Sequence, residues 1–422
     1  MTTTTVRRRA LIAATLTGAL ALTACNSGGE ADGGDDQLTI WMLTNEDSRV
    51  EAMDLMTSGF EEANPGVEIV VEERGTDAHK DAMRRAAGTE AGPDIYWYWR
   101  GPGLGGELVD LGVSLDMTEY YEEYGWDDRF TEPALANITQ YGGYHGVPWT
   151  VQGQGIYYNK ELFEQAGITD LPTSYDELVA VADQLAAAGT TPMALGGTVN
   201  WHVMRLLDNL LETFCGAETA DRLNTEQTGW DSEACVTEAF TELQTWGDEY
   251  LNEGYMGVAQ EDSAQLFFQG NAAMTIEGTW FNQQIVDNGM DPENVGVFLF
   301  PTDTNRIYGF GEGPYVNAMS DNPDLAAEFL DYITSAEIQE QVYQAWGAIS
   351  VNREVEADTS NPLNSAWVEY FANAEGIFTN NDQNLSLEQT TEYWRIQNSV
   401  LTGDIAPEDA GTTFQGFVDS SS

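Results

Sequence analysis

Residues 38–42 read LTIWM, and this apolar run opens the folded part of the chain. Short runs of this kind are typical of buried strands. Apolar side chains then recur at three- and four-residue spacing over residues 50–60. This spacing predicts a helix that ends at the NPG turn of residues 64–66.

The same alternation continues along the chain. Residues 67–71 predict a second strand, residues 79–87 an amphipathic helix, and residues 94–99 a third strand. Strand, helix, strand, helix and strand at this spacing indicate a parallel sheet with helices on its faces.

A second α/β region begins near Pro148. The strand-like residues 155–158 lead into a short helix at 160–165, and Ser174 with Glu177 forms a capping box that starts a stronger helix. No long linker and no repeat period interrupts the sequence. The remaining pattern predicts a mainly helical stretch, two strands, a helix and a helical C-terminal part, at residues 201–251, 295–300, 315–319, 322–333 and from 335 onward.

The beginning of the chain predicts export. Three arginines at residues 7–9 precede an apolar run at 10–21, which is shorter than the roughly 20 residues of a membrane-spanning helix and suits a signal peptide. Residues 22–25, LTAC, resemble the lipobox of bacterial lipoprotein signal peptides. We therefore predict a lipoprotein signal peptide at 1–24 and lipidation of Cys25. An ordinary signal peptide remains the alternative, and the arginine pair leaves both general and twin-arginine export open.

The mature chain divides into a short polar segment and a long body. Residues 26–36 contain no apolar side chain larger than that of Ala31. We therefore expect residues 25–36 to form a flexible tether between the lipid and the folded body. The length of that body predicts two or more domains with substantial cores.

The chain is strongly acidic, with 70 Asp and Glu against 16 Lys and Arg, a formal net charge of −54. Such a surface repels nucleic acid and anionic lipid headgroups, so neither is an expected partner. It also suits a protein that stays dissolved in salty or alkaline surroundings, and by itself it points to no function.

Two cysteines remain once Cys25 carries lipid, namely Cys215 and Cys235. An even pair in an exported chain usually forms a disulfide. Two free buried thiols are the alternative.

Catalytic and metal-binding signatures are absent from the sequence. It lacks H-E-x-x-H, G-x-S-x-G, a Walker loop and C-x-x-C, and we predict no cofactor and no metal site. The glycine-rich residues 101–106 depart from phosphate-binding loops and predict a turn with close backbone packing. Residues 380–388 alternate oxygen-bearing side chains as calcium loops do, but Leu385 and Thr391 break the EF-hand pattern. The three histidines lie far apart along the sequence, at His79, His145 and His202.

Aromatic residues are abundant, with 12 Trp and 18 Tyr, and several lie where strands end or loops begin. Indole faces stack on the C–H faces of sugar rings, while carboxylates, amides and Arg bind the hydroxyls. The same aromatic residues also serve as core in many proteins. The abundance of Trp and Tyr is therefore compatible with a carbohydrate site but does not require one.

Several segments in order resemble the bacterial extracellular solute-binding proteins of the maltose-binding-like carbohydrate importers. They cover nearly the whole mature chain, and their order and spacing carry the resemblance. They are the strand and helix ending in NPG at 38–66, GPDI at 92–95, GVP at 146–148 with YNKELF at 158–163, FQGNAAM at 268–274 with EGTW at 277–280, and NP at 322–323 with TSAE at 334–337.

The resemblance implies a type II periplasmic-binding-protein-like α/β fold. Its two lobes are each a mainly parallel sheet flanked by helices, and the chain crosses the hinge between them three times. The implied N-terminal lobe is 37–149 with 300–334, and the C-terminal lobe is 150–299 with 335–422. The crossings would lie near 148–150, 300–301 and 334–335.

The family's ligand-contacting positions carry over to ten residues of this sequence. Trp280 of the EGTW segment matches the stacking aromatic. The other candidates follow the first strand, follow the GPDI strand, start a helix, lie in a glycine-rich loop or lie near a later helix; they are Asn45, Glu46, Tyr98, Trp99, Arg100, Trp201, His202, Glu312 and Trp346.

The function implied by the resemblance is that of a binding receptor. It would be a monomer anchored by lipid on the extracellular face of the cytoplasmic membrane, as in Gram-positive bacteria. It would bind a carbohydrate, with a di- or oligosaccharide favoured by the aromatic count, and deliver it to the permease of an ABC importer. The alternative from another class is a secreted, lipid-anchored glycoside hydrolase; a receptor for peptides or metals fits less well.

Overall fold

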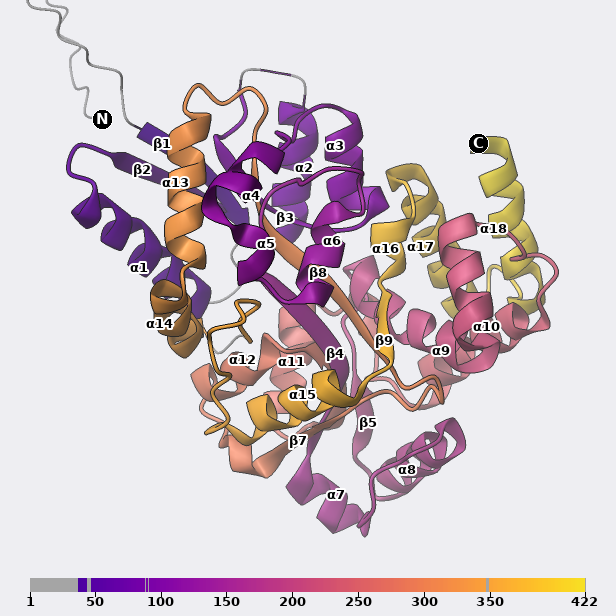
Figure 1. The fold of residues 1–422 in the computed structure, drawn as a ribbon. Helices are drawn as coiled ribbons and strands as arrows, with labels where there is room; N and C mark the ends of the chain where they lie inside the picture. Colours follow the sequence, from indigo (N-terminus) through magenta and orange to yellow (C-terminus); the bar gives the residue numbers. More distant parts are fainter. Residues whose placement is uncertain (1–36, 44–46, 88, 90, 347–348, 422) are drawn as a thin grey trace, which may run out of the picture. The chain divides into compact units, whose positions relative to one another are not determined.

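The computed structural model describes residues 37–421 except 44–46, 88, 90 and 347–348 (Figure 1). The signal peptide, the lipidation of Cys25, the tether, and the candidates Asn45 and Glu46 lie outside the described residues. Among the residues that are described, no helix combines the length and the apolar character needed to cross a membrane.

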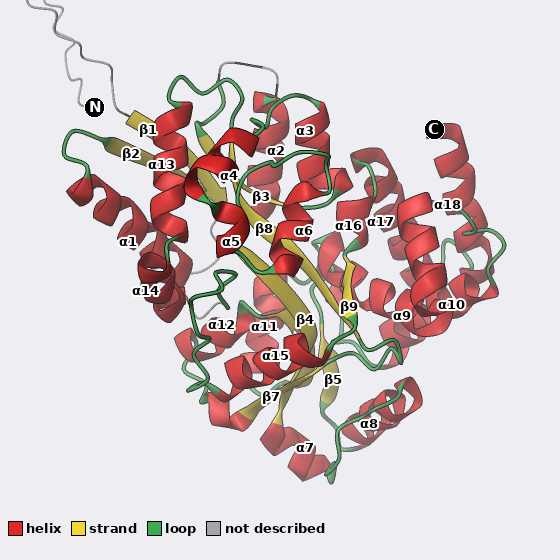
Figure 2. Ribbon diagram, in the orientation of Figure 1, coloured by secondary structure: helices red, strands yellow, loops and turns green. Residues whose placement is uncertain are grey.

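A nine-stranded mixed sheet runs through the described part of the chain (Figure 2). Seven strands follow the order β2-β1-β3-β8-β4-β6-β5, while β7 pairs with β4 and β9 with β8. The strands are β1 Gln37–Leu43, β2 Glu68–Arg74, β3 Ile95–Trp99, β4 Thr150–Asn159, β5 Thr191–Ala194, β6 Ala272–Gly278, β7 Val295–Phe298, β8 Arg306–Val316 and β9 Gly376–Thr379.

The first part of the sheet is parallel, as its strand and helix alternation predicts: β1 pairs in parallel with both β2 and β3. Beyond β3 the sheet becomes mixed, because the two long strands β4 and β8 run antiparallel to each other and to most of their neighbours. Glu312 of β8 lies opposite Trp99 of β3 and Thr150 of β4, where β8 passes from one neighbour to the other. This strand change joins the two halves of the sheet.

The strand predicted at 315–319 lies instead at Arg306–Val316. Its sequence, RIYGFGEGPYV, is rich in glycine and lacks the alternation of apolar and polar side chains that predicts a strand. The glycines are needed for close backbone approach: a Cβ on Gly309 would lie 2.3 Å from the carbonyl oxygen of Gln152, and one on Gly313 2.5 Å from that of Val147. Tertiary contact therefore decides this strand.

Eighteen α-helices surround the sheet in the described residues. In the first half of the chain they are α1 Asp47–Ala63, α2 Thr76–Ala86, α3 Glu107–Asp110, α4 Thr118–Tyr124, α5 Trp126–Arg129, α6 Glu132–Thr139, α7 Lys160–Ala166, α8 Tyr175–Ala187 and α9 Asn200–Asp221. In the second half they are α10 Ala234–Glu249, α11 Gln260–Phe268, α12 Phe281–Asp287, α13 Pro323–Thr334, α14 Ala336–Trp346, α15 Pro362–Asn373, α16 Asn381–Asn384, α17 Leu387–Leu401 and α18 Pro407–Ser421. Short π-helical or 3-10 turns lie at η1 Pro102–Gly106, η2 Arg222–Glu226, η3 Tyr255–Gly257 and η4 Pro292–Asn294.

Two large apolar cores form at opposite ends of the sheet order. One is built on β1, β3, α1 and α13, and the other on α8, α9, α10, α17 and α18. Helix α14 contributes Ile338, Val342 and Trp346 to the first core and lies beside α1 (Figure 1). The division of the chain into lobes stays a prediction, and this packing favours placing the last boundary after α14 rather than before it.

A disulfide joins Cys215, in the last part of α9, to Cys235, in the first turn of α10, with 5.1 Å between their Cα atoms. The two helices pack against each other. The predicted turn at 101–106 is a π-helical turn in which Gly103 packs directly on the backbone of Leu385.

Candidate functional site

A cavity of about 420 Å³ lies where β3, β4 and β8 meet. Its walls come from α1, α2 and β3 on one side and from α9, α11, α12 and α16 on the other. Glu312 and Trp99 lie at its β3–β8 pairing, and Gln152 lies opposite Phe310 at its β4–β8 pairing. The strand change in the sheet therefore positions side chains of both halves around one space.

Five aromatic side chains line this cavity. Phe268 of α11 and Phe310 of β8 accompany three indoles, and the rings of Trp280 and Phe310 lie 5.7 Å apart. The guanidinium of Arg205 lies over the ring of Trp201 at 4.8 Å and over that of Trp280 at 5.1 Å. The indoles are those of Trp99, Trp201 and Trp280.

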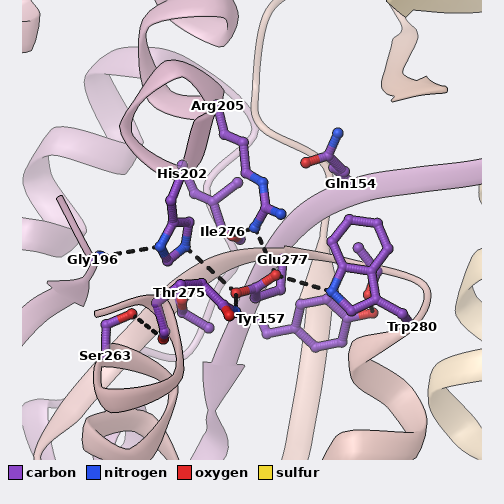
Figure 3. Close-up of polar contacts among 12 residues, drawn as sticks. Gln154, Tyr157, Gly196, His202, Arg205, Ser263, Thr275, Ile276, Glu277 and Trp280 are labelled. Carbon is purple, nitrogen blue, oxygen red and sulfur yellow. Dashed lines mark hydrogen bonds and ion pairs between the residues drawn. The ribbon is translucent and has the colours of Figure 1, made fainter. Parts of the chain in front are cut away.

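The buried carboxylate of Glu277 holds the Trp280 side of the wall (Figure 3). Its Oε2 accepts hydrogen bonds from Arg205 at 2.6 Å and from the indole N–H of Trp280 at 3.1 Å. Its Oε1 accepts one from the amide of Gln260 at 2.7 Å. Burial acts to raise the pKa of Glu277, but the charge of Arg205 and the hydrogen bonds outweigh it, so its pKa lies below the ordinary value. One ionised carboxylate thus orients three cavity residues.

His202 lies behind this network and is fully buried. The backbone N–H of Gly196 donates to its Nδ1 at 3.0 Å, so the neutral ring carries its proton on Nε2, which faces Glu277 Oε1 at 3.5 Å (Figure 3). Burial lowers the pKa of His202 to about 4, against the charge of Glu277, which acts to raise it. The imidazole is therefore a neutral support at pH 7.

Position 278 of the EGTW segment requires glycine because the Trp280 ring packs against it. A Cβ on Gly278 would lie 2.0 Å from the Trp280 ring, closer than any side chain tolerates. The indole therefore packs on the bare backbone at the end of β6, where Glu277 can accept its N–H.

Two ion pairs start from the α1 and α2 side of the cavity. Arg49 of α1 contacts Glu312 at 2.9 Å, and its guanidinium lies over the ring of Trp346 at 4.8 Å. Lys80 of α2 contacts Asp382 of α16 at 3.2 Å and lies over the ring of Trp99 at 4.7 Å. Both pairs are nearly buried.

Hydrogen bonds to the buried carboxylate of Asp208 anchor helix α16. The carboxylate accepts hydrogen bonds from the backbone N–H and side chain of Asn381 and from the hydroxyls of Tyr308 and Tyr393, at 2.8–3.0 Å. Burial raises the pKa of Asp208 to about 7, although these hydrogen bonds act to lower it. The anchoring presents Asp382 and its neighbours to the cavity.

Some polar atoms of the cavity residues are buried without a hydrogen-bond partner among the described residues. Apart from Arg49 Nη2 and Glu312 Oε1, which form an ion pair with each other, they are Trp201 Nε1, Asp382 Oδ1 and Gln383 Oε1, one donor and two acceptors. Buried polar atoms normally have partners, so these atoms favour a bound polar ligand. The described residues contain no group of three or more His, Cys, Asp and Glu side chains that could hold a metal ion.

The family model of the bacterial extracellular solute-binding proteins matches residues 45–340 of this chain. The chain belongs to this family. Its members are substrate-binding receptors rather than enzymes, and the assignment made from the motif order is confirmed.

Individual relatives and solved structures agree with this family assignment. The multiple sugar-binding protein of Streptococcus mutans is 23% identical over 396 residues, covering 91% of this chain and 92% of that protein. An uncharacterised ABC transporter extracellular-binding protein of Pyrococcus horikoshii is 28% identical over 239 residues, which is 55% of this chain and 52% of that relative. Among solved structures, a chitin oligosaccharide binding protein superposes with a TM-score of 0.84 at 23% identity, over 91% of this chain and 98% of the other. The expected two-lobed type II fold is confirmed.

The solute-binding protein brings four of the ten candidate residues together on the cavity wall: Trp99, Trp201, Trp280 and Glu312. Four others do not line it. Tyr98 alternates with Trp99 along β3 and packs with Met83 and Leu104.

Of the other three described candidates, His202 and Trp346 contact residues that hold the wall, whereas Arg100 bonds to backbone outside it. Arg100 donates to the carbonyl oxygens of His145 at 2.9 Å and Val147 at 2.6 Å. His202 faces Glu277, and Trp346 underlies Arg49.

Sequence reasoning missed much of the polar wall. Arg205 lies one helical turn after Trp201 and also lines the cavity. The helix-start segment that identified Trp201 could therefore have identified Arg205 as well. Lys80 is one of two lysines in an acidic chain, which was a second signal. Two of the alternating oxygen-bearing residues, Asn380 and Asp382, line the cavity together with Gln383.

Proposed function

We propose that this protein is the extracellular receptor of an ABC importer and that it binds an oligosaccharide in the cavity described above. The observation that carries the proposal is the wall itself. Three indoles, including Trp280, stand beside Arg, Lys, carboxylate and amide groups on both sides of one space. The relationship to the multiple sugar-binding protein supports the same ligand class.

The chemistry of this wall fits a sugar. A pyranose presents C–H faces that pack on the electron-rich faces of aromatic rings, and a rim of hydroxyls that donate and accept hydrogen bonds. The indoles provide the faces. Unpartnered acceptors at Asp382 and Gln383 and the unpartnered Trp201 N–H provide partners for the rim. A cavity of about 420 Å³ lies in the size range of small-molecule sites.

Binding would couple to lobe closure. Lys80, Arg49 and Trp99 come from one half of the sheet order, and Trp280, Arg205 and Gln260 from the other. A sugar that contacts both sets stabilises the closed arrangement by its differential affinity, which the permease then recognises. We infer a monomer, anchored through Cys25 on the extracellular face of the cytoplasmic membrane.

The rival function, glycoside hydrolysis, requires a carboxylic acid that keeps its proton near neutral pH beside a second carboxylate. The two most buried carboxylates on the cavity wall, Glu312 and Asp382, are each already paired with a cation of the protein. This pairing supports a binder. Incubation with labelled oligosaccharides separates the two functions, because a receptor returns them intact.

A thermal-shift panel of mono- and oligosaccharides, followed by titration calorimetry of each hit, tests the proposal. A ligand that binds only the folded state raises the melting temperature in a concentration-dependent way. We expect at least one neutral oligosaccharide to do so. A panel in which no sugar shifts the melting temperature, or in which the protein cleaves its ligand, would overturn the proposal.

A further inference from the structure

A second hollow of about 210 Å³ adjoins the main cavity. The two spaces share three wall residues, Lys80, Trp201 and Asp382. The second space continues between α2 and η1 on one side and the start of α9 and α17 on the other. It therefore extends the same interval between the two halves of the chain.

The three shared residues lie where the two hollows adjoin. Lys80 and Asp382 are 302 positions apart in sequence and meet at 3.2 Å, and Trp201 lines both spaces beside them. Asp382 is only 6% exposed, yet its Oδ1 has no hydrogen-bond partner among the described residues. The indole N–H of Trp201 likewise lacks one there. One acceptor and one donor thus remain unused at the junction of the two hollows.

The second hollow repeats the chemical mixture of the first. Trp394 of α17 and Leu104 of η1 provide apolar surface, and Asp77 and Asp81 provide carboxylate oxygens at its edge. The indole N–H of Trp394 contacts the sulfur of Met204 at 3.2 Å, and a thioether is a weak acceptor. An aromatic face beside hydroxyl-binding oxygens is again suited to a sugar ring.

The cations of both hollows are neutralised within the protein. Arg49 contacts Glu312, Lys80 contacts Asp382, Arg205 contacts Glu277, and Arg84 lies 3.6 Å from Asp81. These four are all the Lys and Arg side chains that line either space among the described residues. An acidic sugar would enter a site whose cations already have partners, in a chain of net charge −54. The charge balance therefore favours a neutral ligand.

We propose that the second hollow is a further subsite, and that the ligand is a neutral, linear oligosaccharide that passes Trp201 and fills both spaces. One or more units stack near Trp280, the chain passes the Lys80–Asp382 pair, and a terminal unit packs on Trp394. The inference rests on the proposed sugar-binding function and adds the length and charge of its ligand.

Calorimetry with neutral oligosaccharide series, namely xylo-, cello-, malto- and chito-oligosaccharides from mono- to hexasaccharide, tests the proposal. In the series that binds, affinity should increase with chain length until the main cavity is filled, and should increase further once the oligosaccharide is long enough to reach the second hollow. Trp394→Ala should remove that increment, about two- to tenfold from the value of one aromatic contact, and leave shorter chains unchanged. Trp394→Phe should retain most of it.

A second variant guards against a folding defect in Trp394→Ala. Thr198 is exposed at the rim of the second hollow, so Thr198→Trp should obstruct that space without disturbing the core. It should weaken long chains only. A uronic-acid-terminated chain of the same length should bind more weakly than its neutral counterpart.

The outcomes separate this inference from the function it rests on. Failure of every sugar to bind overturns both. Tight binding of short chains, with no further gain in longer ones or with equal losses at all lengths in Trp394→Ala and Thr198→Trp, overturns the second subsite and leaves the receptor function standing. Equal or tighter binding of the acidic chain overturns the neutral ligand.

Discussion

Trp280 and Glu277 are joined by a hydrogen bond of 3.1 Å from the indole N–H to Oε2, at the end of β6. The same carboxylate receives Arg205 and Gln260, so the orientation of a stacking surface and of two polar side chains depends on one buried charge. Trp280 lines the cavity, whereas Glu277 does not. Substitutions at the two positions therefore test direct ligand contact and the positioning of the contact residue separately.

Glu277→Gln should destabilise the protein and weaken sugar binding together. The change leaves the nearly buried Arg205 without its anionic partner, and breaking a buried ion pair costs about 3–5 kcal/mol of unfolding free energy. Urea unfolding and calorimetry measure the two effects. A variant as stable as the parent would show that the pair contributes little to the fold.

Trp280→Ala should lower sugar affinity by about ten- to a hundredfold, the usual cost of truncating a central aromatic contact, with little effect on the melting temperature. Trp280→Phe should restore part of the loss. Trp41→Ala is a matched control, since this partly buried indole stacks on Arg74 away from the cavity. Unchanged affinity in Trp280→Ala would remove this residue from the binding surface.

Gly278→Ala should weaken sugar binding although the new methyl group touches no ligand. Its Cβ would lie 2.0 Å from the Trp280 ring and displace the indole from Glu277. Gly416→Ala in α18 is the control, because a Cβ there meets nothing within 4 Å and a helical Gly→Ala change stabilises by about 0.5–1 kcal/mol. Intrinsic tryptophan fluorescence and calorimetry follow both variants. Equal affinities in the two would contradict the packing argument.

Acid should destabilise the protein through His202. Its folded pKa of about 4 lies below the unfolded value of about 6.5. Between these pH values the unfolded chain binds a proton at this residue that the folded chain does not bind. This stabilising contribution is complete above pH 6.5 and is lost as pH falls towards 4. Asp208, whose folded pKa is raised to about 7, acts with the opposite sign over much of that window.

The difference between the parent and His202→Gln isolates the histidine. Urea unfolding at several pH values should give a free-energy gap between them that narrows on acidification from pH 7 to pH 5. A gap that stays constant over this range would mean that His202 does not titrate as its burial implies.

Reduction of the Cys215–Cys235 disulfide should lower the free energy of unfolding by about 3 kcal/mol, the chain-entropy value for a loop of this size. Neither cysteine lines the cavity, so sugar affinity should persist at temperatures where the reduced protein is folded. The double variant Cys215→Ser and Cys235→Ser should match the reduced parent. A large loss of affinity with little loss of stability would contradict this division.

Much of the fold could be predicted because it is encoded locally. The β1–α1–β2 alternation and the helix α13 follow from apolar periodicity and from residue types at short spacing. Trp99, Trp201, Trp280 and Glu312 were identified through the resemblance to the solute-binding family, since each matches a ligand-contacting position of that family. Strand β8 was misplaced because its glycines report contacts with distant backbone and carry no strand pattern of their own.

The sequence by itself determined the family, the order of the elements and the presence of indoles near the strand ends. Only the tertiary structure decided which charges meet: Lys80 with Asp382, Arg49 with Glu312, and Arg205 with Glu277. With 70 acidic residues, each cation had many possible partners along the chain. The fold selects among them, because side-chain pairing depends on distance in space, which the packed strands and helices establish and sequence spacing does not.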